Sequence, residues 1–68
     1  MWTVYDEHGH NLGETSSKLD ALNTAKMHIA NGAMYITLHS SSAGASFRVY
    51  EEVTAPQGVR VETIHSGM

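Results

Sequence analysis

The chain has 68 residues, no cysteine, and four basic against seven acidic side chains, which give a formal net charge of −3 at pH 7. This length predicts a single domain over residues 1–68, with a thin core that self-association would help to stabilise. The lack of cysteine excludes disulfides and thiolate metal sites, and the acidic balance makes nucleic acid an unlikely partner. No apolar run approaches about 18 residues and no basic and apolar leader begins the chain, so we expect a cytoplasmic protein that does not span a membrane.

The N-terminal part predicts a strand and a turn. Residues 2 to 6 alternate apolar and polar side chains, as a short strand does. The turn that follows should hold Gly9 at a positive φ and bond Asp6 to the turn backbone. Residues 11 to 14 are then either the partner strand of a hairpin or a loop, because Leu12 is their only large apolar residue.

A helix is predicted over residues 18 to 31. Ser17 begins it as an S-x-x-D cap, and Gly32 ends it as the glycine that a helix C-terminus favours. At helical spacing one sector collects the apolar side chains, which we expect to face a sheet: Leu19, Leu22, Ala25 and Ile29. Met27 lies outside this sector.

Three further strands are predicted over residues 33–40, 46–54 and 59–65, each from alternating apolar and polar side chains. Consecutive strands with short connections should form an antiparallel meander. Glu51 falls on the apolar face of its strand and indicates a bulge, a sheet edge or a strand end there. Residues 66–68 are expected to fray.

This order of elements, β(β)αβββ, predicts an α+β two-layer sandwich in which one helix packs on one face of a small, mostly antiparallel sheet. The face under the helix should bury Trp2, Val4, Met34, Ile36, Leu38, Phe47, Val49, Val59 and Val61. A serine-started, Ala- and Leu-rich helix with flanking short strands resembles many small bacterial and phage domains, and no motif in it carries an activity. The second sheet face should remain uncovered.

That uncovered face is the main candidate for function. We expect it to carry Tyr5, Tyr35, His39, Arg48, Tyr50, Arg60 and Ile64. Tyrosine and arginine are enriched at protein interfaces because they combine a large contact area with hydrogen bonding. Tyrosine is also common in strands for reasons of propensity alone, so the same pattern suits a face that merely shields the sheet. We predict a partner-binding surface made by these residues other than Ile64, with Met27 as a further contact.

The face can also be interpreted as a nucleic-acid platform, on which bases stack on aromatic rings and arginine binds phosphate. Glu52 and Glu62 oppose this interpretation because they place carboxylates among the arginines. His8 and His10 supply two imidazoles at a turn, fewer than the ligands a zinc or nickel site needs, so no metal and no cofactor is predicted.

No nucleophile-turn or phosphate-binding motif occurs, so we do not expect an enzyme. The sequence predicts a small interaction module, adaptor-like or inhibitor-like, that binds a larger protein or a second copy of itself. A nucleic-acid-binding domain that uses stacking on the sheet is the alternative.

Overall fold

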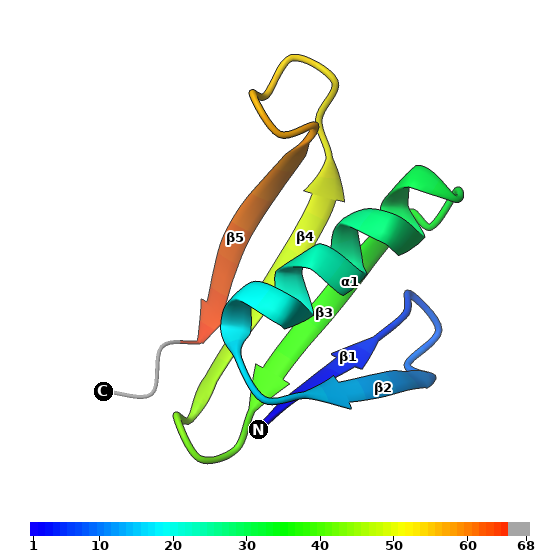
Figure 1. The fold of residues 1–68 in the computed structure, drawn as a ribbon. Coiled ribbons are helices and arrows are strands. Elements are labelled where there is room, and N and C mark those ends of the chain that lie inside the picture. Colours follow the sequence, from blue (N-terminus) through cyan, green and yellow to red (C-terminus); the bar gives the residue numbers. More distant parts are fainter. Residues whose placement is uncertain (66–68) are drawn as a thin grey trace.

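The computed structural model describes residues 1–65 and confirms the α+β class, with one helix on one face of a five-stranded antiparallel sheet (Figure 1). The elements in chain order are β1 (Trp2–Tyr5), β2 (Asn11–Thr15), α1 (Lys18–Ala30), β3 (Tyr35–Ser40), β4 (Ala45–Glu51) and β5 (Val59–His65). The strands lie in the order β2-β1-β3-β4-β5. Residues 11 to 14 are therefore strand rather than loop, and the last three strands form the predicted meander. The expected fraying of residues 66–68 lies outside the described residues.

The turn between β1 and β2 has the predicted geometry. Gly9 adopts a φ of 82°, and one Asp6 carboxylate oxygen accepts hydrogen bonds from the backbone N–H groups of His8 and His10 at 2.9 and 2.8 Å. Glu7 ties the turn to the start of β3, since its carboxylate accepts from the N–H of Met34 at 2.8 Å. The turn thus fixes the end of β1, the start of β2 and the start of the central strand β3.

Both ends of α1 are set by the residues that predicted them. The Ser17 hydroxyl accepts from the N–H of Asp20 at 3.1 Å, which satisfies a donor that the first helical turn leaves free. The helix ends at Ala30, one residue earlier than expected, with Asn31 as its C-cap, and Gly32 follows with a φ of 106°. Local backbone chemistry therefore decides where this helix begins and ends.

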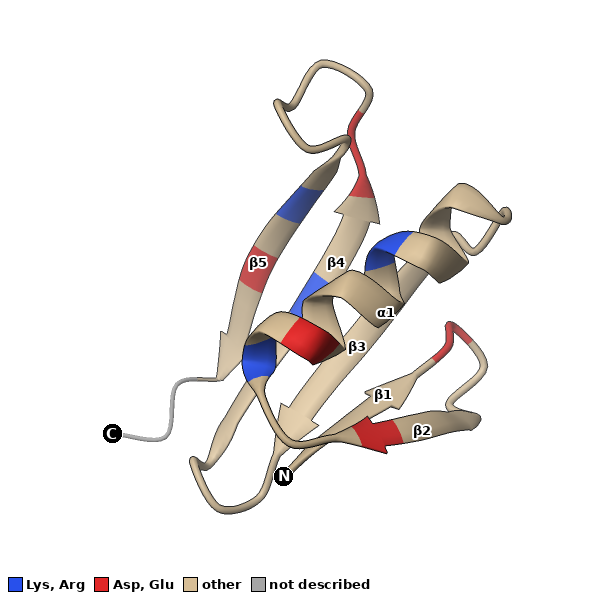
Figure 2. Ribbon diagram, viewed as in Figure 1, with Lys and Arg blue, Asp and Glu red and all other residues tan. Residues whose placement is uncertain are grey.

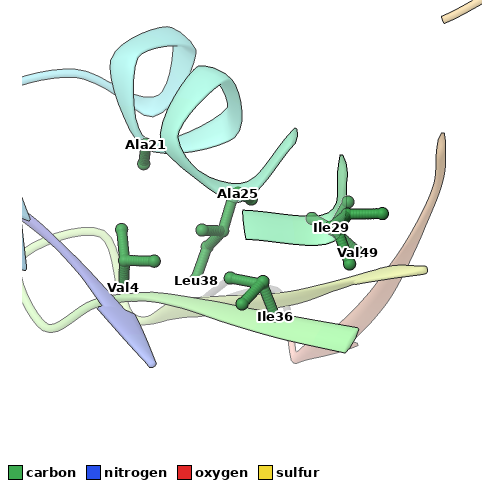
Figure 3. Close-up of a cluster of buried hydrophobic side chains, with 7 residues drawn as sticks. All are labelled: Val4, Ala21, Ala25, Ile29, Ile36, Leu38 and Val49. Carbon is green, nitrogen blue, oxygen red and sulfur yellow. The ribbon is translucent and has the colours of Figure 1, made fainter. Parts of the chain in front are cut away.

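The core lies between α1 and the central strands, as Figure 3 shows. Its fully buried side chains are Val4, Ala21, Ala25, Ile29, Ile36, Leu38 and Val49. The prediction that Leu19 belongs to the buried stripe is wrong, because its side chain is 66% exposed. Leu19 lies roughly 120° around the helix from Ala25 at 3.6 residues per turn. Ala21 and Ala25 lie at the centre of the contact and let the helix approach the sheet closely. With these alanines facing the sheet, Leu19 points sideways into solvent.

The reach of α1, the start of β3 and the end of β4 correct three further predictions. The helix packs on β1, β3 and β4 and reaches the edge of β2, while β5 lies outside its cover (Figure 1). Val61 is consequently 41% exposed instead of buried. Met34 is 74% exposed because it precedes β3 and lies in the helix–strand connection, where its N–H is bonded to Glu7. Val53 is 85% exposed because β4 stops at Glu51 and not at residue 54.

Glu51 therefore marks a strand end, one of the three interpretations that its apolar-face position allowed.

Among residues 1–65 the single helix has 13 residues, and it is too short and too polar to cross a membrane.

Candidate functional site

In residues 1–65 no second layer covers the sheet face opposite α1 (Figure 1). Strand register places Tyr35 opposite Tyr50, and His39 opposite Ser46, on β3 and β4. Since side chains alternate between the two faces of a strand, these residues point away from the buried Ile36. The same register places all of the predicted site residues except Met27 on this surface, which we call the open face: Tyr5, Tyr35, His39, Arg48, Tyr50 and Arg60.

Four side chains of the open face stack into one continuous row across three strands. The Arg48 guanidinium carbon lies 4.7 Å from the Tyr35 ring centroid. The Tyr35 and Tyr50 ring centroids are 5.9 Å apart, and the Arg60 guanidinium carbon lies 4.7 Å from the Tyr50 ring. We call Arg48, Tyr35, Tyr50 and Arg60 the aromatic ladder. Each cation–π contact contributes about 0.5–1 kcal/mol at an exposed site, so the ladder holds its four side chains in place.

The two arginines of the ladder differ in their charge partners. Arg60 forms ion pairs with Glu62 and, at 4.0 Å, with Glu52. Arg48 forms no ion pair with any group in residues 1–65, and its Nε is buried without a hydrogen-bond partner there. Glu62 is its cross-strand neighbour but bonds Arg60 instead. The open face therefore carries one guanidinium charge that the described chain leaves uncompensated.

Two side chains of the open face, His39 and Tyr35, also form hydrogen bonds. The Nδ1 of His39 lies 2.7 Å from the hydroxyl of its cross-strand neighbour Ser46. The Tyr35 hydroxyl donates to the backbone carbonyl of Glu7 at 3.3 Å, which fixes the ladder to the β1–β2 turn. Tyr5 lies opposite Thr37 on β3. Stacking or hydrogen bonds thus restrain each predicted residue of the open face except Tyr5.

Met27 does not share this surface. It lies on α1, in the other layer of the sandwich, and its side chain is 55% exposed. With Leu19 and Asn23 it forms an exposed stripe at four-residue spacing, which we call the helix stripe. Ile64, also expected on the open face, lies where the β4–β5 register shifts opposite Ser46 and Phe47, and it is half exposed.

The remaining chemical candidate, the β1–β2 turn, is a structural feature. Its His8 and His10 rings lie 6.0 Å apart, and no group of three or more His, Cys, Asp or Glu within residues 1–65 is arranged to hold a metal ion. Desolvation opposes ionisation of Asp6, but hydrogen bonds from the His10 and His8 N–H groups outweigh it and lower the pKa of this carboxyl. The Met34 N–H lowers the pKa of Glu7.

No pocket opens on the part of the surface formed by residues 1–65, so the candidate site is a flat face. Comparison of the chain with protein-family models, with curated proteins and with solved structures gives no match in any of the three. Its function must therefore be inferred from its own residues.

Proposed function

We propose that the protein is a non-enzymatic interaction module that binds a larger protein through the open face, as an adaptor or an inhibitor. The observation that carries the proposal is the aromatic ladder, in which two tyrosines and two arginines stack across β3, β4 and β5 without cover from the rest of the described chain. Large amphipathic side chains of these types supply most of the binding energy at protein interfaces.

The stacking of the ladder favours binding because it lowers the entropy that association must remove. Immobilising one flexible side chain at an interface costs about 0.5–1.5 kcal/mol. Arg48 and Tyr35 are already in contact in the unbound chain, as are Tyr50 and Arg60. A partner therefore meets a surface whose rotamers are largely settled.

Arg48 defines the chemistry that the partner must present. A carboxylate placed against its free guanidinium N–H groups would form a charge-assisted hydrogen bond, which is about twice as strong as a neutral one. The chain as a whole carries a net charge of −3, so a strongly acidic partner would be repelled at long range. The expected partner surface is thus neutral or basic, with one acidic side chain among apolar groups.

Nucleic acid is the competing ligand for the same face. Stacking of bases on Tyr35 and Tyr50 would be chemically reasonable. Phosphate binding is disfavoured, because Glu52 and Glu62 neutralise Arg60 and leave Arg48 as the only unpaired cation of the ladder within the described residues. Titration with single-stranded and duplex oligonucleotides at low salt decides this point, since binding that weakens steeply with added salt would overturn the protein-partner proposal.

The test of the proposal compares how the wild type and two matched variants capture a partner protein in an affinity pull-down. The ladder variant carries Tyr35→Thr, Arg48→Thr and Tyr50→Thr, because threonine keeps the strand propensity of these positions. The control variant carries Leu19→Ala, Asn23→Ala and Met27→Ala on the helix stripe. Circular dichroism and thermal melting establish that both variants fold.

We expect a partner that the wild type and the helix-stripe variant capture and that the ladder variant loses. Arg48→Lys should weaken binding as well, since lysine keeps the charge but not the planar, bidentate donor geometry. Capture that survives in the folded ladder variant would refute the assignment of the open face. Capture lost in the helix-stripe variant would move the binding site to Met27 and its neighbours.

A further inference from the structure

The sheet ends at β5, a long and exposed edge strand. It has seven residues, and all except Val59 are exposed. Within residues 1–65 no strand pairs with its outer side, and α1 does not cover it. Both edge strands have a register irregularity, but on β5 it lies beyond Thr63 and leaves residues 59–63 regular, whereas β2 has only five residues in all, contains Gly13 and has its irregularity within them. Irregular, short edges resist pairing with another chain, whereas long regular ones favour it.

We propose that two copies of this chain pair their β5 strands antiparallel, about a two-fold axis that is perpendicular to the sheet and lies midway between the two copies of Val61. The two sheets then form one continuous sheet of twice the width. This inference goes beyond the proposed function and does not rest on it, because the pairing uses the free backbone edge of β5; Arg60 is the one ladder residue that also lies at this edge.

Charge complementarity selects the register. A two-fold axis perpendicular to the sheet keeps each face on its own side, so the residue on the axis lies opposite its own copy. With Val61 on the axis, Arg60 lies opposite the partner's Glu62, and Glu62 opposite the partner's Arg60. With Arg60 or Glu62 on the axis, two like charges lie directly opposite each other, which destabilises a strand pair.

The other registers lose strand overlap. An axis at Val59 would bring Arg60 opposite the partner's Gly58, which lies in the loop and has a φ of 76°. An axis at Thr63 would centre the pairing next to the register shift that faces Ser46 and Phe47. Val61 is therefore the position that combines a regular strand with opposite charges across the interface.

The helix side of β5 fits the same register. Val61 is 41% exposed although it points to the side of the sheet that carries α1. In the proposed dimer it contacts the partner's Val61, and Val59 lies opposite the partner's Thr63, so both valines lose exposed apolar surface. This gives a physical reason for an exposed valine at position 61.

The charges on β5 need little rearrangement to form the interface. Arg60 and Glu62 already pair along the strand, and they are the adjacent basic and acidic bands on β5 in Figure 2. In the dimer each of these two charges has its counterpart across the axis, so neither Arg60 nor Glu62 is isolated. The Arg60 ends of the two aromatic ladders would then meet near the axis, on the same face of the joined sheet.

A charge-exchange experiment tests this register. Sedimentation equilibrium from micromolar to millimolar protein should show a concentration-dependent dimer for the wild type. Arg60→Glu alone, or Glu62→Arg alone, places like charges opposite each other at two positions and should weaken association about tenfold or more. An equimolar mixture of these two variants should associate again, as should the double variant. Glu14→Arg on β2 is the matched control and should dimerise like the wild type.

Cross-linking gives a second, geometric readout. Val61→Cys introduces the only cysteine of the chain, and the proposed axis brings the two copies of this position to a Cα separation of about 4.5–5.5 Å, within disulfide range. Val59→Cys is the control, because its two copies are offset by roughly 13 Å along the strands. Mild oxidation should cross-link the first variant and not the second.

A wild type that stays monomeric at every concentration would overturn the proposal. A dimer that is unchanged by both single charge variants, or disrupted by Glu14→Arg, would place the interface elsewhere and overturn it too. Equal cross-linking of Val59→Cys and Val61→Cys would exclude the proposed register.

Discussion

Alanine substitution at Leu19 and at Leu38 removes the same three carbon atoms from two very different environments. Leu38 is fully buried in β3, whereas Leu19 is 66% exposed on α1. Hydrophobic periodicity alone assigns both side chains to the core. The two variants therefore measure how α1 is rotated over the sheet.

The expected magnitudes are far apart. For Leu38→Ala, the lost transfer free energy is about 2.4 kcal/mol at about 0.8 kcal/mol for each carbon, and the cavity raises the total cost to about 3 kcal/mol or more. For Leu19→Ala only about a third of the side chain leaves a protein contact, and alanine is the better helix former, so the net cost should be below about 0.5 kcal/mol. A domain of this size has a total stability of only about 3–10 kcal/mol.

Urea unfolding, followed by far-ultraviolet circular dichroism and by Trp2 fluorescence, gives both free energies of unfolding. Because Leu38→Ala removes a large share of the stability, Ile36→Val serves as a milder core variant with an expected cost of about 1 kcal/mol. If Leu19→Ala costs as much as Ile36→Val or more, the helix faces the sheet with the Leu19 side. The rotation of α1 that leaves Leu19 exposed would then be refuted.

Three further outcomes follow from local features of the fold. Ser17→Ala removes the acceptor for the Asp20 N–H and should lower the free energy of unfolding by about 1 kcal/mol, measured in urea; an unchanged value would mean that this cap does not stabilise α1. Gly32→Ala meets no atom within 4 Å but must adopt a φ of 106°, so the same assay should show a cost of about 1–2 kcal/mol from the backbone alone, and a neutral substitution would contradict that. Because Asp6 and Glu7 have lowered pKa values in the folded chain, the unfolded chain binds more protons, and the stability these carboxylates provide at neutral pH is lost as the pH falls below about 4. Asp6→Asn keeps the turn acceptor and should make melting temperatures less sensitive to acid, whereas parallel pH profiles for variant and wild type would exclude a contribution from Asp6.

Much of the open face could be predicted because strand alternation is a local property. The positions of Tyr35, Tyr50 and Arg48 on one face follow from a period of two residues along each strand. The stacking of Arg48 on Tyr35 does not follow, because it depends on the β3–β4 register that sets Thr37 opposite Arg48. The unpaired charge of Arg48 could not be predicted either, because the sequence alone does not show which of the two arginines pairs with Glu62.

The sequence by itself determined the element order and the ends of the helix, because Ser17 and Gly32 act on backbone groups within a few residues of themselves. Only the tertiary structure decided which side of α1 is buried and how far across the sheet it reaches. These depend on the fit of two small side chains, Ala21 and Ala25, against strands distant in the chain. A prediction from periodicity gives most weight to large apolar residues such as Leu19. Close packing of a helix on a sheet instead favours small residues at the centre of the contact. A single helix about 10 Å across covers only two or three strands spaced about 4.8 Å apart, and this leaves β5 uncovered.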